Sequence, residues 1–106
     1  MKTYNKLVRD KIPDIILKDH CLPTTRILDD KEYIEELNKK LMNEVKVYLE
    51  EENVEDMVDI LEVIRAILDV KGTSYEEIEE KRIKKLKKRG GFKDKVYLEK
   101  VTESGD

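Results

Sequence analysis

Three carboxylates, Glu44, Asp56 and Asp59, stand at helical positions that a small protein usually gives to apolar side chains. Each residue of a helix turns by about 100° from the last, which places Glu44 at the edge of the apolar stripe that contains Leu41. Asp56 and Asp59 share one side of the following helix with Val63. Like charges gathered in one space repel each other unless a cation lies between them. The pattern therefore predicts a Mg²⁺ site between two antiparallel helices, with Mn²⁺ as an alternative ion.

Such a site would suit phosphate chemistry. Mg²⁺ prefers oxygen ligands, keeps several waters and commonly bridges a few carboxylates to substrate phosphates. With Glu44, Asp56 and Asp59 as ligands, a metal-activated water could attack a phosphorus atom, and Lys or Arg side chains would stabilise the developing charge. Acids at this spacing also occur on ordinary exposed helices, so the pattern alone leaves a solvent-facing role open.

The apolar spacing predicts the helices that would hold these acids. Asp29 or Asp30 is placed to cap the helix that carries Glu44, Asn53 is the predicted turn, and Gly72 is placed to end the next helix. The four predicted helices span residues 13–20, 31–52, 54–71 and 75–89.

Two further stretches have the composition of strands. Residues 25–28 are a short β-type run, and residues 92–101 alternate between apolar and polar side chains. The predicted fold is therefore an all-α bundle of about four helices in one domain, residues 1–106, with a short two-stranded β ribbon formed by these stretches.

The composition excludes several classes of function. The 106 residues are 44% charged and 39% hydrophobic, with a net charge of −3, so there is no basic excess with which to hold a nucleic acid. No apolar run resembles a signal peptide or a membrane span, which predicts a cytoplasmic protein with no membrane partner. The one basic stretch, residues 81–89, is either a solvated helix face or a surface for phosphates.

The chain also resembles a known family over nearly its whole length. The most specific motif is the opening Tyr4-Asn5-Lys6-Leu7-Val8-Arg9-Asp10-Lys11-Ile12-Pro13, and the order continues through Arg26-Ile27-Leu28-Asp29, Lys40-Leu41, Asp59-Ile60-Leu61-Glu62-Val63-Ile64, Lys81 and Arg89-Gly90-Gly91-Phe92. These motifs resemble the MazG-like and phosphoribosyl-ATP pyrophosphohydrolase-like members of the all-α nucleoside triphosphate pyrophosphatase superfamily.

This resemblance implies a Mg²⁺-dependent helical bundle that cleaves nucleoside triphosphates between the α and β phosphorus atoms, releasing a monophosphate and pyrophosphate. It also implies a homodimer or homotetramer with a nucleotide substrate. The side chains that it places near the phosphates are Lys6, Arg9, Lys11, Lys81 and Arg89.

The sequence departs from the family at the metal site. The family carries a Glu-Glu-x-x-Glu element on one helix, where this chain has Asn43, Glu44 and Val47, and a Glu-x-x-Asp element on the next, where this chain has Asp56 and Asp59. Valine cannot ligate a metal, and Glu51, one turn further along, is a candidate substitute. The leading interpretation is thus a nucleotide pyrophosphohydrolase. The alternatives are an impaired homologue that binds nucleotide or a protein partner, and an acidic helical adaptor with no ligand.

Overall fold

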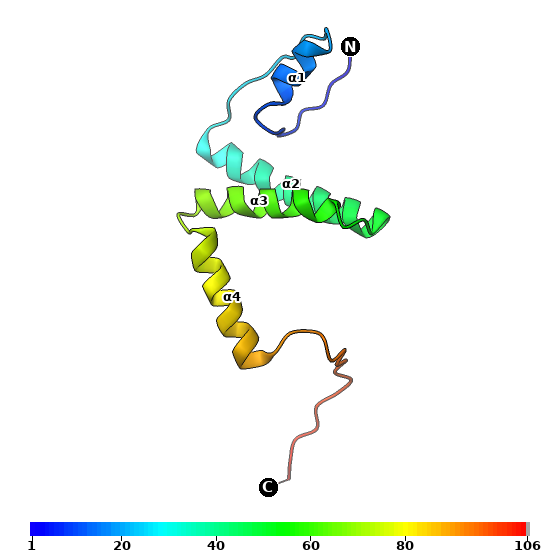
Figure 1. The fold of residues 1–106 in the computed structure, drawn as a ribbon, viewed down its shortest axis with the longest axis vertical. Helices are drawn as coiled ribbons and strands as arrows, with labels where there is room; N and C mark the ends of the chain where they lie inside the picture. Colours follow the sequence, from blue (N-terminus) through cyan, green and yellow to red (C-terminus); the bar gives the residue numbers. More distant parts are fainter. Residues whose placement is uncertain (106) are drawn as a thin grey trace. The chain divides into compact units, whose positions relative to one another are not determined.

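The computed structural model describes residues 1–105, which form two compact units. The first unit, Met1–Ser74, contains three helices, and the second, from Tyr75 onward, contains one. The helices are α1 (Ile12–Lys18), α2 (Asp30–Glu51), α3 (Asp56–Val70) and α4 (Tyr75–Arg89) (Figure 1). The described residues contain four helices and no strand, which confirms the all-α prediction and is consistent with a helical bundle.

Local chemistry fixes both ends of α2. The Asp29 side chain accepts a hydrogen bond of 2.8 Å from the Glu32 backbone N–H, so it caps the helix as predicted. The helix ends at Glu51, and the residue that caps it, Glu52, has a φ of 50°, in the left-handed region. One residue later, Asn53 Oδ1 accepts a hydrogen bond of 3.0 Å from the backbone N–H of Glu55, which closes the turn. Four residues, 52–55, therefore reverse the chain direction.

Helices α2 and α3 lie side by side and run antiparallel (Figure 1). Leu37 on α2 and Val63 on α3 are 3% and 7% exposed and are the buried apolar side chains among residues 1–105. Other apolar side chains of the same helices remain largely in solvent, including Met42 at 76% and Leu49 at 66% exposure. The interior of this helix pair is therefore small.

The predicted β ribbon does not form in the described part of the chain. Residues 25–28 and 92–101 contain no strand, and Ile27 and Tyr97 within them are 96% and 87% exposed. A strand needs a partner for its backbone hydrogen bonds, and alternating side chains alone do not supply one. The ribbon is thus not confirmed, while the single-domain assignment stays a prediction.

The ends of α3 and α4 follow the glycine signals. Gly72, with φ of 73°, follows the last turn of α3, and Gly90, with φ of 81°, follows α4.

Across the residues described, no helix combines the length and apolarity required to cross a membrane.

Candidate functional site

Glu44 is an acidic side chain largely withdrawn from water. It lies on α2, its side chain is 12% exposed, and its Oε1 is 3.4 Å from the Nζ of Lys40, one turn earlier on the same helix. Lys40 is itself only 25% exposed in its side chain. Because both charged groups are partly desolvated, their attraction is screened less than that of a surface pair. Glu44 is thus held by one cation and lies at the edge of the helix interface, as its place in the apolar stripe predicts.

Asp59 is paired with the N-terminal segment. Arg9 Nη2 donates a hydrogen bond of 2.6 Å to Asp59 Oδ1, across 50 residues of sequence. Both side chains are about half exposed, at 53% and 46%. The opening motif and α3 therefore meet at a predicted phosphate-binding residue and a predicted metal ligand.

Asp56 begins α3 and faces an acidic neighbour. Its Oδ2 atom is buried and has no hydrogen-bond partner among the described residues. Glu51, the last residue of α2, lies close to it, and the negative charge of Asp56 raises the pKa of Glu51 above its ordinary value. The short turn between α2 and α3 brings these two carboxylates together, and a buried carboxylate oxygen without a partner is unfavourable unless a proton or a cation satisfies it.

Glu44, Asp56 and Asp59 have the oxygen ligands that a divalent cation prefers, but the structure does not group their carboxylates around one point. Within residues 1–105, no three His, Cys, Asp or Glu side chains are grouped as metal ligands would be. Glu44 and Asp59 are occupied by Lys40 and Arg9, whereas Asp56 has an oxygen to offer. A cation held here would need waters or substrate phosphates for its remaining positions, which is how Mg²⁺ is usually bound in proteins.

The predicted phosphate-binding cations are divided between the two units. Lys6, Arg9 and Lys11 are exposed on the N-terminal segment, where the Lys6 ammonium stands 5.6 Å from the centre of the Tyr4 ring. The other two are exposed on α4 in the second unit: Lys81 and Arg89. Within that unit Lys81 lines a shallow hollow with other α4 side chains. Within residues 1–105, Arg9 is the one of these five cations that forms an ion pair with a predicted metal ligand, Asp59.

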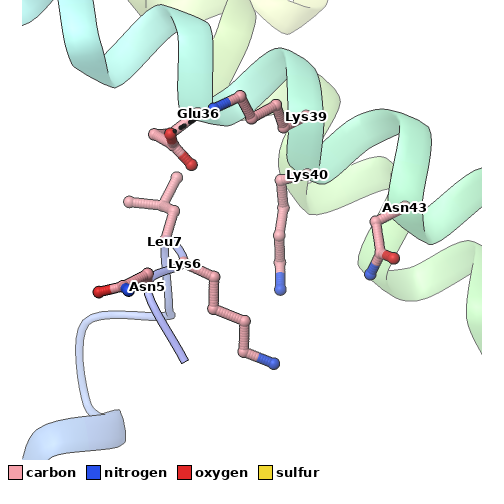
Figure 2. Close-up of a pocket in the computed structure, with 7 residues that line it drawn as sticks. All are labelled: Asn5, Lys6, Leu7, Glu36, Lys39, Lys40 and Asn43. Atoms are coloured by element: carbon pink, nitrogen blue, oxygen red, sulfur yellow. Dashed lines mark hydrogen bonds and ion pairs between the residues drawn. The ribbon is translucent and has the colours of Figure 1, made fainter. Parts of the chain in front are cut away.

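A pocket of about 310 Å³ lies between the N-terminal segment and α2 (Figure 2). Lys6 and Lys40 extend into the same space, and Asn43 stands at its edge (Figure 2). The complete lining is Asn5, Lys6, Leu7, Glu36, Lys39, Lys40 and Asn43. Lys40 and Asn43 were not among the predicted binding residues. The sequence could have indicated Lys40, because a lysine four residues before Glu44 on a helix is placed to pair with it. No local sequence pattern indicates that Asn5 and Lys6 lie near α2.

Comparison of the chain with protein-family models, curated proteins and solved structures found no match. The family resemblance of the motifs therefore stays a prediction, and the residues themselves carry the functional argument.

Proposed function

We propose that this protein is a Mg²⁺-dependent nucleoside triphosphate pyrophosphohydrolase, producing a nucleoside monophosphate and pyrophosphate. The observation that carries the proposal is the Lys40–Glu44 pair. Lys40 lines a cationic pocket and at the same time contacts a largely buried carboxylate of the predicted metal set. A helix surface that presents carboxylates beside lysine ammonium groups suits a polyphosphate with a bound metal ion: the carboxylates would bind the metal and the ammonium groups the phosphates.

The side chains would divide the work as follows. Glu44, Asp56 and Asp59 would hold the cation, and Glu51 stands next to Asp56 as a further oxygen donor. Bound Mg²⁺ would supply Lewis acidity and an activated water. Arg9 at Asp59 and Lys6 at the pocket would neutralise phosphoryl oxygens, and Lys11 is a further candidate in the same unit.

A panel of nucleoside triphosphates incubated with the protein and Mg²⁺, and assayed for pyrophosphate, tests this function. We expect release of pyrophosphate with at least one nucleotide, and loss of release in a Glu44→Gln, Asp59→Asn double variant. Release no greater than that of the double variant across the whole panel would reject the enzyme.

The alternative is an impaired homologue that binds nucleotide or a protein partner, and Asn43 and Val47 favour it because neither supplies a carboxylate. A nucleotide that binds the folded state raises its melting temperature. If the panel shows no hydrolysis, such a rise with Mg²⁺ and nucleotide would identify a nucleotide-binding protein, whereas an unchanged melting temperature would favour a protein-interaction role.

Substitution of Val47 by glutamate should strengthen Mg²⁺ binding by about tenfold or more, because an added carboxylate supplies a charged oxygen ligand. Val47 is half-buried on α2, one turn from both Glu44 and Glu51, so the new carboxylate would join these two. Isothermal titration with MgCl₂ measures the change.

Lys46→Glu is the control, because it adds a glutamate at the neighbouring exposed position and lowers the net charge by two units, where Val47→Glu lowers it by one. Residue 46 is turned by about 100° from residue 47 and by about 200° from Glu44, so its side chain points away from Glu44. An equal gain in both variants would show that net charge, and not a shared site, attracts the ion.

We also propose that the protein is a homo-oligomer, with a dimer as its smallest form. Met42, Val45 and Leu49 are exposed on α2 at three- and four-residue spacing, and Met57 and Leu61 are exposed on α3. At about 100° per residue, the α2 stripe is turned roughly 110° from Leu37 and the α3 stripe roughly 140° from Val63. Because the two helices run in opposite directions, rotations of the same sign from their mutual contact place both stripes on the same face of the helix pair.

At the same 100° per residue, Lys40, Glu51 and Asp59 are turned toward the opposite side of the pair. A second copy seated on the apolar side would therefore leave the acids and the pocket open. A second copy would also bury apolar side chains that a single chain leaves exposed to water. Such a partner requires no other protein, because other copies of the same chain are present in solution.

Light scattering tests the oligomer. The parent protein should have at least twice the chain mass, and Leu49→Lys should shift it toward the mass of one chain. Val58→Lys is the control, because Val58 is 56% exposed on α3 but is turned away from this apolar side. A parent protein with the mass of a single chain would overturn the proposal.

A further inference from the structure

The pocket between the N-terminal segment and α2 carries more positive charge than its own acid can neutralise. Its lining contains three lysines and one glutamate, a net charge of +2. The glutamate is already occupied, because Glu36 Oε1 accepts a hydrogen bond of 3.0 Å from Lys39 Nζ (Figure 2). Lys6 makes no ion pair with a described residue and stands over Tyr4. Lys40 is paired with Glu44, which lies outside the lining, at 3.4 Å. Lys6 is therefore the ammonium group of this hollow that no acid of the described chain pairs, and it lies beside the ammonium group of Lys40 (Figure 2).

The polar groups that complete the lining can donate hydrogen bonds to an anion. Asn5 and Asn43 have side-chain amides, which bind phosphate oxygens through N–H groups and add no negative charge. Asn43 stands where the resembled family has a glutamate, and a carboxylate at that position would repel an anion in the pocket. The volume of about 310 Å³ is at the small end of ligand sites, which suits a phosphate chain better than a complete nucleotide.

We propose that this pocket binds a pyrophosphate-type anion, held by Lys6 and Lys40 and by the amides of Asn5 and Asn43. In the proposed enzyme this anion is the terminal pair of phosphates of the nucleotide, and that identification rests on the proposed function. Lys40 is held at the pocket by Glu44, whose Oε1 lies 3.4 Å from Lys40 Nζ and so orients the ammonium group. Binding of the anion itself requires neither hydrolysis nor a metal.

Titration of the parent protein with inorganic pyrophosphate in the presence of EDTA tests the site. We expect saturable binding, at least about tenfold weaker binding of inorganic phosphate, and none of a nucleoside without phosphates, because charge-assisted hydrogen bonds carry the affinity. Lys6→Gln and Asn43→Glu should each weaken pyrophosphate binding by about tenfold or more. Lys6 is exposed and Asn43 lies at the rim, so neither variant should unfold the protein.

Lys46→Gln is the matched control, since Lys46 is exposed on α2 and does not line the pocket. Parent-like affinity in Lys6→Gln and Asn43→Glu, or an equal loss in Lys46→Gln, would overturn the site. The two proposals can fail separately. Pyrophosphate binding that depends on Lys6 without any nucleotide hydrolysis would retain the anion site and reject the enzyme. Hydrolysis with an unchanged KM in Lys6→Gln and Asn43→Glu would retain the enzyme and reject the site.

Discussion

Replacement of Asp56 by asparagine should slow pyrophosphate release from a nucleoside triphosphate by at least about 100-fold. Groups that merely orient metal ligands already change metal affinity or activity by roughly 10–100-fold, so a direct ligand should matter at least as much. Among the described residues, Asp56 is the acid with a buried carboxylate oxygen, Oδ2, that has no hydrogen-bond partner, and the amide of asparagine removes its charge. The rate is measured from pyrophosphate release at saturating Mg²⁺.

The same substitution separates function from folding. Asp56 and Glu51 repel each other, as the raised pKa of Glu51 indicates, so Asp56→Asn should fold at least as stably as the parent. Asp69→Asn is the matched control, because Asp69 is an exposed acid at the other end of α3. Parent-like turnover by Asp56→Asn would remove this residue from the proposed metal set.

Leu37→Ala should have the largest effect on stability, lowering the free energy of unfolding by about 2–5 kcal/mol. Leu37 is 3% exposed and, with Val63, forms the buried apolar interior of the described chain. A small domain has only about 5–15 kcal/mol of stability in total, so a loss of this size would leave much of the protein unfolded at moderate temperature. Urea denaturation followed by circular dichroism measures it.

Leu22→Ala makes the same chemical change where no packing is lost. Leu22 is 92% exposed in the segment between α1 and α2, and its substitution should change the free energy of unfolding by less than about 0.5 kcal/mol. Similar losses in the two variants would show that the contact between α2 and α3 is not what stabilises the protein.

The local signals in the sequence predicted the helices well. Asp29 caps α2, Gly72 follows α3, and Asn53 lies in the turn, because each acts on backbone groups only a few residues away. Local signals of this kind could not show whether the predicted β ribbon forms. Its strands would have to find each other across more than 60 residues, and neither stretch offers more than a side-chain pattern.

The candidate site shows the same division between local and distant information. Helical spacing indicated that Glu44 would lie at the edge of the interface, and its side chain is largely buried. Spacing could not show that Arg9 would reach Asp59, or that Lys6 would lie near Lys40, because tertiary packing alone brings these residues together. The resemblance placed Lys6 and Arg9 near phosphates, and that role stays a proposal.

The small interior of the α2–α3 pair has a consequence for how the protein is handled. If partner copies supply much of the buried surface, then folding and association are one equilibrium, and dilution alone should lower the melting temperature. Assays at nanomolar enzyme would then sample a less ordered species than assays at micromolar enzyme. Specific activity would rise with protein concentration, because Leu37 and Val63 are the buried apolar side chains among the described residues.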